Sequence, residues 1–235
     1  MFRDLLRKYV RPIIMGVRSI FYIDDKFVKY SGYSTCYRRS SIDSILEPIF
    51  PFLRDNPDYE SGTILASNEL VQKGDHVVAV GSGVGITALH AKTLVGDSGS
   101  VTVFEGGKKS LDFTIGTFSN YPDLPVTIIY SLVGLNIGVY GKKFATALLD
   151  PKDLPECDIL ELDCEGAELE IISNMIVRPR VIIVETHGNF GSPSARIEKL
   201  LISKGYKIKF REIADKSSYS YCEENDLYVL GAHLI

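Results

Sequence analysis

The sequence lacks the features that mark several common classes of protein. Its 235 residues include four cysteines, but no Cys-x-x-Cys pair and no Cys/His spacing typical of a zinc site. No stretch approaches the roughly 20 consecutive apolar residues that a membrane-spanning helix needs. The formal net charge is −4, so no overall basic field is available to attract nucleic acid. These absences argue against a zinc-site, a membrane-spanning and a nucleic-acid-binding protein.

Residues 1–70 are expected to form an N-terminal extension, largely helical, ahead of a main domain at residues 71–235. The first 18 residues carry five basic side chains against a single acid, Asp4, with apolar residues between them at helical spacing. This segment could pack its apolar side on the core or make a weak contact with an anionic membrane surface. Isolated thiols suit a reducing compartment, and no small-residue cleavage site follows the basic start, so a cytoplasmic location is expected.

The most informative string runs from His76 to Ile86, an apolar segment that passes into glycines at alternate positions, Gly81, Gly83 and Gly85. A second apolar run ends on Glu105. Glycines let the backbone approach a nucleotide-sized ligand at a helix N-terminus. An acid at the end of the next strand can hydrogen-bond the two hydroxyls of a ribose. The pair of features predicts a site for a nucleoside cofactor.

From Lys73 onward, strand-like and helix-like segments alternate, which is typical of an α/β fold with a parallel sheet. We expect strands near residues 76–81, 100–105, 126–130, 157–163 and 181–186. Two more, near 206–210 and 226–230, follow each other without a crossover helix and should be antiparallel. The predicted fold class is therefore a doubly wound, seven-stranded, mostly parallel sheet whose last strand is antiparallel.

Two further strings are distinctive. Residues 158–168 read Asp-Ile-Leu-Glu-Leu-Asp-Cys-Glu-Gly-Ala-Glu, and residues 179–187 read Pro-Arg-Val-Ile-Ile-Val-Glu-Thr-His. The Gly-x-Gly-x-Gly spacing looks like motif I of class I S-adenosylmethionine-dependent methyltransferases, and with Glu105 these strings resemble the FkbM-type family over roughly residues 60–190. The resemblance implies a Rossmann-like methyltransferase fold with strand order 3-2-1-4-5-7-6.

The resemblance also implies which residues bind the cofactor. The glycine segment would line the methionine and ribose portions, Glu105 would take the ribose hydroxyls with Gly106 beside it, and the residues after the third strand would border the adenine. The predicted cofactor-binding residues are Gly81, Ser82, Gly83, Gly85, Glu105, Gly106, Ser131, Leu132 and Asp163. One departure matters, because class I enzymes usually carry an acid two residues before the first glycine, where this chain has Ala79. Cofactor binding is then expected to need a substitute such as Glu60.

In that strand order, the point where the order reverses lies between the first and fourth strands, and ligands bind there beyond the carboxyl ends. Asp163 ends the fourth strand, Glu185 ends the fifth, and His187 follows two residues later. His187 is the candidate general base for a hydroxyl nucleophile, and the alternative is a loop histidine that only packs. Asp163 and Glu185 could orient it, contact the acceptor or, together with it, coordinate Mg²⁺.

The sequence therefore predicts a methyltransferase that uses S-adenosylmethionine to methylate a hydroxyl of a small molecule or glycan. A methyltransferase-like protein that binds without catalysing stays open, with Ala79 as its main support. An NAD-dependent oxidoreductase is a weaker alternative, because Ile86 stands where the dinucleotide fingerprint has its last glycine. The sequence leaves the acceptor and the oligomeric state undetermined.

Overall fold

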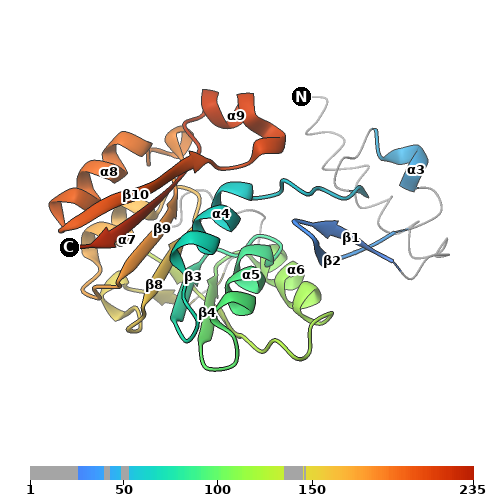
Figure 1. Ribbon diagram of the computed structural model, residues 1–235, viewed down its shortest axis with the longest axis horizontal. Coiled ribbons are helices and arrows are strands. Elements are labelled where there is room, and N and C mark those ends of the chain that lie inside the picture. The colour runs from blue at the N-terminus through green and yellow to red at the C-terminus, as the bar shows by residue number, and fades with distance from the viewer. Residues whose placement is uncertain (1–25, 40–42, 49–52, 135–144, 146) are drawn as a thin grey trace.

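A seven-stranded sheet forms the centre of the molecule in the computed structural model, which describes residues 26–39, 43–48, 53–134, 145 and 147–235 (Figure 1). In spatial order its strands are β5 (Thr127–Tyr130), β4 (Ser100–Glu105), β3 (His76–Val80), β8 (Ile159–Leu162), β9 (Val181–Glu185), β11 (Tyr228–Leu234) and β10 (Tyr206–Ile213). Strands β5, β4, β3, β8 and β9 pair in parallel, and β11 runs antiparallel to both of its neighbours. Numbered along the chain, the strands follow the predicted order 3-2-1-4-5-7-6.

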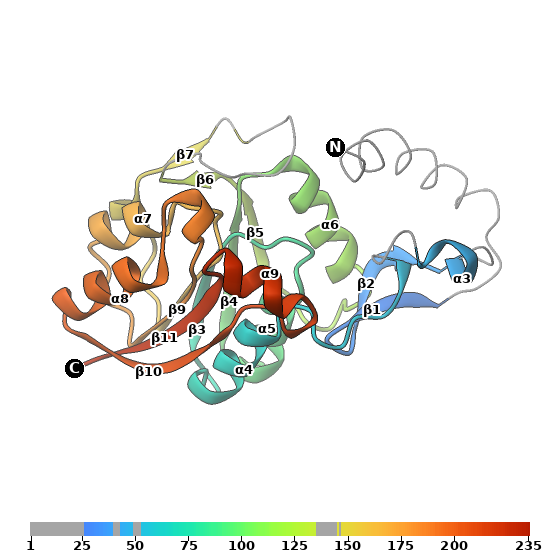
Figure 2. The ribbon, with the colours of Figure 1, turned by 90° about the horizontal axis from the view of Figure 1, so that it is seen from above.

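Helices cover both faces of this sheet, with α4 (Ser61–Leu70), α5 (Ile86–Val95) and α6 (Lys108–Phe118) on one side and α7 (Glu168–Asn174) and α8 (Ser194–Ser203) on the other (Figure 2). Because side chains alternate along a strand, β3 sends Val77 and Ala79 toward α4 and α5, and Val78 and Val80 toward α7 and α8. Coverage on both sides explains why the strand sequences are continuous apolar runs.

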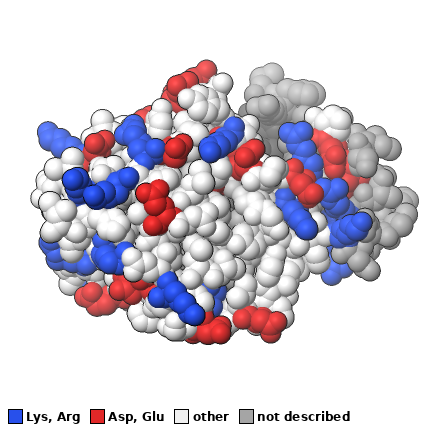
Figure 3. All heavy atoms as spheres, in the orientation of Figure 1, with Lys and Arg blue, Asp and Glu red and all other residues white. Residues whose placement is uncertain are grey.

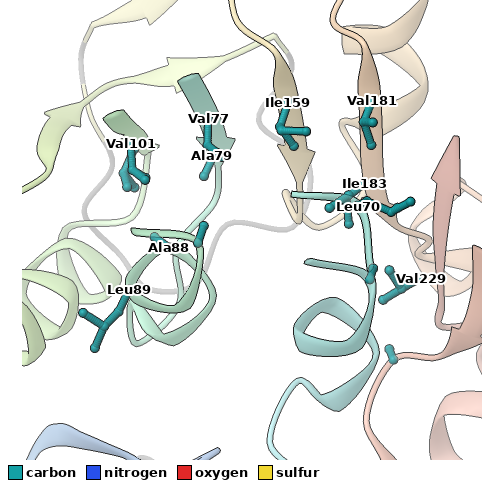
Figure 4. Packing of buried hydrophobic residues seen from close by; sticks show 14 of the residues in the cluster. Leu70, Val77, Ala79, Ala88, Leu89, Val101, Ile159, Val181, Ile183 and Val229 are labelled. Atoms are coloured by element: carbon teal, nitrogen blue, oxygen red, sulfur yellow. The ribbon is translucent and has the colours of Figure 1, made fainter. Parts of the chain in front are cut away.

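Figure 4 shows the apolar layer between the sheet and helices α4 and α5. Leu89 on α5 is fully buried, and Leu70 on α4 packs in the same cluster as Val229. Burial of such side chains stabilises the fold, since truncating one buried leucine to alanine typically costs about 2–5 kcal/mol. This layer fixes α5, and with it the glycine segment that precedes α5, against the sheet.

The described part of the N-terminal extension begins with an antiparallel hairpin, β1 (Phe27–Tyr30) and β2 (Tyr33–Arg38), where the sequence predicted mostly helix. Alternating aromatic and β-branched residues favour a strand there. The hairpin packs on α6, since the amide of Cys36 donates to Thr117 Oγ1 at 3.0 Å. Two helices follow the hairpin, α3 (Asp43–Leu46) and α4, as the sequence predicted for the extension. Helix α4, however, packs against the sheet as part of the main core. The basic segment at residues 1–18 lies outside the described residues.

Short elements complete the described fold. They are β6 (Leu132–Val133), β7 (Leu148–Leu149), the 3₁₀ turns η3 (Pro151–Asp153), η4 (Gly188–Phe190) and η5 (Lys216–Ser218), and α9 (Tyr219–Glu224). None of the helices in the described ranges has the length and apolar content to cross a bilayer. In Figure 3, the described basic side chains are interspersed with acidic ones over the visible face, in keeping with the mixed charge of the sequence.

Candidate functional site

The glycine segment lies between β3 and α5, and all three of its glycines have positive φ: 87° at Gly81, 52° at Gly83 and 86° at Gly85. Residues with a β-carbon rarely adopt these angles, so the segment requires glycine for its backbone shape. It also requires glycine for space, because a β-carbon on Gly81 would lie 1.8 Å from the carbonyl oxygen of Asp163. The glycine segment and the end of β8 are therefore in direct backbone contact.

Glu105, at the end of β4, holds the glycine segment in place. Its Oε2 accepts hydrogen bonds from the amide of Ser82 at 2.9 Å and from Ser82 Oγ at 2.8 Å. Its Oε1 accepts from the amide of Gly107 at 2.7 Å. Oε2 thus accepts two bonds, while Oε1 has capacity for one more. The structure thus brings Glu105 to the glycine segment, as the sequence predicted, and its contact with a ribose stays a prediction.

The other predicted cofactor residues lie beside Glu105. The amide of Ser131 donates to the carbonyl of Glu105 at 3.1 Å, and a β-carbon on Gly106 would lie 2.4 Å from Leu132 Cδ2. Strand β5 pairs with β4, so its end reaches the same edge of the sheet. Residues from the ends of three neighbouring strands therefore line one edge around the glycine segment.

Next to this edge lies a group of ionisable side chains that we call the His187 cluster, made of His187, Asp163, Glu165, Glu168 and Glu185. His187 Nδ1 lies 2.9 Å from Glu168 Oε1, in hydrogen-bond contact. His187 Nε2 lies 3.6 Å from Asp163 Oδ1, 3.7 Å from Glu185 Oε1 and 3.9 Å from Glu165 Oε2. His187 is almost fully buried, and no Lys or Arg among the described residues pairs with these acids. Asp163, Glu185 and His187, which the sequence predicted to act together, are thus brought together.

Glu168 explains the Glu-Gly-Ala-Glu string, since its carboxylate organises the turn between β8 and α7. Oε1 of Glu168 accepts hydrogen bonds from the amides of Cys164 at 3.2 Å and Gly166 at 3.1 Å, as well as contacting His187. Glu165 adopts a left-handed conformation, with φ of 55°, and so does Gly166. An acid at a helix start is favoured by the helix dipole alone, but the side chain of Glu168 also fixes the imidazole of His187.

The acids determine the protonation of His187. Burial alone would lower the pKa of His187, but the hydrogen bond to Glu168 and the charges of Asp163, Glu168 and Glu165 raise it to about 9. Burial raises the pKa of Asp163, and burial together with the charge of Asp163 raises that of Glu185 well above its usual range. Without another cation in the cluster, the imidazole therefore holds its proton at neutral pH. Its role as a general base stays a prediction.

The same three side chains could hold a metal ion. One ligand atom each from Asp163, Glu185 and His187 lies within 4.8 Å of the others. Glu168 fixes His187 through Nδ1, which leaves Nε2 directed at the two carboxylates, as in sites where a carboxylate orients a metal-binding histidine. Oxygen-rich donor sets suit Mg²⁺ and Mn²⁺, and an imidazole ligand shifts the preference away from Mg²⁺. The donor set therefore fits a divalent cation.

Two further acids lie near the glycine segment: Glu60, which the sequence offered as a substitute for the missing acid, and Glu161, which was not among the predicted site residues. Glu60, the residue before α4, places Oε1 3.6 Å from the position a β-carbon on Gly83 would occupy, and the hydroxyl of Tyr59 lies at the same distance. Glu161 lies on β8 directly beside Ala79 of β3. The departure at Ala79 was the only signal in the sequence that pointed to acids of this kind.

Comparison with known families identifies the chain. A sequence model described as the methyltransferase FkbM domain matches residues 55–208, more than half of the chain. The chain belongs to this family. The match spans the glycine segment, Glu105 and the whole His187 cluster, and confirms the resemblance that their motifs carried. It counts against the alternative of an NAD-dependent oxidoreductase. A comparison with curated proteins found no match.

Solved structures show the same fold. The chain is similar to a ribosomal protein L11 methylase from Lactobacillus delbrueckii subsp. bulgaricus, with 15% identity, a TM-score of 0.53, and coverage of 77% of this chain and 81% of that one. It is also similar to precorrin-6y C5,15-methyltransferase from Geobacter metallireducens GS-15, with 15% identity, a TM-score of 0.50, and coverage of 73% and 87%. At such identities the likeness shows the fold alone, the Rossmann-like methyltransferase fold.

Proposed function

We propose that this member of the FkbM methyltransferase family transfers the methyl group of S-adenosylmethionine to a hydroxyl of a small molecule or glycan. S-adenosylmethionine supplies an electrophilic methyl group, which an oxygen nucleophile takes in an in-line displacement while the electrons of the broken C–S bond stay on sulfur. The observation that carries the proposal is the contact between the glycine segment and the end of β8. It supports a cofactor site directly beside the His187 cluster.

The residues of the chain have two tasks in this reaction. The first is to align the acceptor oxygen with the methyl group, since positioning supplies a large share of the barrier reduction in bimolecular displacements. The glycine segment and Glu105 would hold one partner at the edge of the sheet. The second is to remove the proton of the acceptor hydroxyl as the bond to carbon forms. Asp163, Glu185 and His187 are the side chains we assign to it.

We further propose that Asp163, Glu185 and His187 perform the second task by holding a divalent cation, Mg²⁺ or Mn²⁺. The support is the donor set itself, because one ligand atom from each of the three side chains lies within 4.8 Å of the others and, among the described residues, no Lys or Arg pairs with the acids. A cation held there would lower the pKa of an acceptor hydroxyl close to it. His187 would then be a ligand, and activity without metal would favour its role as general base instead.

Methyl transfer to a panel of acceptors tests the proposed function. The purified full chain would be incubated with methyl-labelled S-adenosylmethionine and, separately, with monosaccharides, oligosaccharides, hydroxylated small molecules, a protein mixture and an RNA mixture. Label in a hydroxyl-bearing small molecule or glycan supports the proposal, while label only in protein or RNA overturns it. Cofactor binding without transfer to any acceptor supports the alternative of a non-catalytic binding protein.

A further inference from the structure

A methyltransferase of this kind has to bind the positively charged α-amino group of its cofactor, and this chain lacks the usual acid for it at Ala79. The side chain of Ala79 is fully buried in the apolar cluster between the sheet and helices α4 and α5. Alanine has no polar atom in its side chain, so position 79 supplies no group to the ligand. A carboxylate that replaces the missing one must come from another element.

Glu161 is the first candidate for the replacing carboxylate, because the register of the sheet fixes its position next to Ala79. It lies beside Ala79 on the neighbouring parallel strand, and residues paired in this way point to the same face of the sheet. Glu161 is 2% exposed, hydrogen-bonds the side chain of Thr87 in the first turn of α5, and its Oε2 has no hydrogen-bond partner in the part of the chain that the structure describes. A buried carboxylate oxygen without a partner is costly unless a ligand satisfies it.

Glu60 is the second candidate, and its backbone is strained. It has φ of 49° and ψ of 36°, a left-handed conformation that costs a residue with a β-carbon roughly 1–2 kcal/mol. That conformation brings Oε1 close to Gly83, while Tyr59 holds the carboxylate by a hydrogen bond. Strain that persists in a folded protein often serves a site rather than stability.

The pKa of Glu60 is raised well above its usual range, mainly by burial and then by the charge of Asp163. The charge of Glu161 also contributes to this rise, which indicates that Glu60 and Glu161 lie near each other. No Lys, Arg or His among the described residues lies within ion-pair distance of either carboxylate. Burial also raises the pKa of Glu161 to about 7, so the two acids favour their neutral forms until a cation binds, and within the described residues the protein supplies no cation.

We infer that Glu60 and Glu161 together bind the α-amino group of S-adenosylmethionine and so replace the acid missing at Ala79. This inference rests on the proposed cofactor use and assigns two residues of the same site. Glu60 contributes from the start of α4 and Glu161 from inside the sheet, so the amino group would be held between two elements more than 100 positions apart in sequence.

Binding of two ligands by the full chain, measured by titration calorimetry, tests the inference. S-adenosylhomocysteine carries the amino-acid end, while 5′-methylthioadenosine has the same adenosine and lacks that end. Glu60→Gln and Glu161→Gln should each weaken binding of S-adenosylhomocysteine about tenfold or more, because a charge-assisted hydrogen bond is lost. Binding of methylthioadenosine should change less than about twofold. Asp58→Asn, which removes the same charge from an exposed neighbour, should leave both affinities unchanged.

Two more variants separate binding from folding. Glu60→Gly relieves the strained backbone, so it should keep the thermal stability of the wild type and still lose affinity for S-adenosylhomocysteine. Ala79→Asp combined with Glu161→Ala moves the carboxylate to the adjacent strand and should recover affinity that Glu161→Ala alone loses. Equal weakening of both ligands, or unchanged affinity in the glutamine variants, would overturn the inference while leaving the proposed function intact. Wild-type protein that binds neither ligand would overturn both.

Discussion

The backbone of Gly81 passes so close to Asp163 that no side chain fits between them, and this contact joins the cofactor edge of the sheet to the His187 cluster. Gly81→Ala should therefore both strain the backbone and displace the end of β8. We expect the variant to lose at least about 3 kcal/mol of unfolding free energy, from the positive φ and the overlap together. Chemical denaturation monitored by circular dichroism measures this loss.

Gly191→Ala is the matched control for Gly81→Ala. Gly191 has the same φ of 87°, but nothing lies within 4 Å of its would-be β-carbon. Its substitution should lower the unfolding free energy only by the strain of the positive φ, about 1–2 kcal/mol. Equal losses in the two variants would contradict the close contact between Gly81 and Asp163.

Glu105 is predicted to be important for cofactor affinity, because it anchors Ser82 and has acceptor capacity left for a ribose. Glu105→Gln should weaken binding of S-adenosylmethionine by about 1–3 kcal/mol through lost charge-assisted hydrogen bonds. Ser82→Ala removes one of the bonds to Glu105 and keeps the carboxylate, so its effect should be smaller. Folded Glu105→Gln protein with unchanged affinity would refute the ribose assignment.

His187 is predicted to act in catalysis and not in cofactor binding. His187→Ala should lower the rate of methyl transfer about 10²-fold or more while sparing the affinity for S-adenosylmethionine. Glu168→Gln, which keeps the shape of the side chain but loses the charge beside Nδ1, should lower the rate by a smaller factor. His90→Gln, a change in another buried histidine on α5, should retain the wild-type rate. Full activity of His187→Ala would remove the assignment.

Removal of metal distinguishes the two roles considered for His187. If Asp163, Glu185 and His187 hold a cation, incubation with EDTA followed by desalting should abolish methyl transfer, and Mg²⁺ or Mn²⁺ should restore it. The imidazole in the donor set predicts that Mn²⁺ restores it at a lower concentration than Mg²⁺. Activity that is unchanged after chelation would rule out the cation and leave His187 as the candidate base.

Acid should weaken the fold through His90. His90 Nδ1 lies 2.8 Å from the Tyr33 hydroxyl and Nε2 lies 3.0 Å from Asn68 Oδ1, and burial lowers the pKa of His90 below its usual 6.5. The unfolded chain therefore takes up a proton first as the pH falls, so the stability contribution of His90 is complete above pH 6.5 and decreases below it. Between pH 7 and 5, His90→Gln should lose less unfolding free energy than the wild type. An equal loss would contradict this role.

Much of the architecture could be predicted because its signals are local. Apolar runs such as Val181–Glu185, glycines at alternate positions and an acid after the second strand are all readable along the chain. They placed the strands, and the family resemblance implied the strand order and with it the edge where Gly81, Glu105, Asp163 and His187 meet. The hairpin β1–β2 was missed because two short strands packed on α6 depend on contacts with a helix some 80 positions away.

The acids of the site show the limit of sequence reasoning more clearly. That Glu161 lies beside Ala79 depends on the register between β3 and β8, which no local pattern fixes. That Glu60 faces Gly83 depends on a left-handed residue before α4. The contact of Glu168 with His187 could not be predicted, because it exists only once β9 lies beside β8.

Titration of the full-length chain with S-adenosylmethionine in a calorimeter tests the central claim most directly. The account predicts saturable binding at one site, and weaker binding at that site in Glu105→Gln. The absence of any heat of binding up to millimolar cofactor, with the protein folded by circular dichroism, would contradict it.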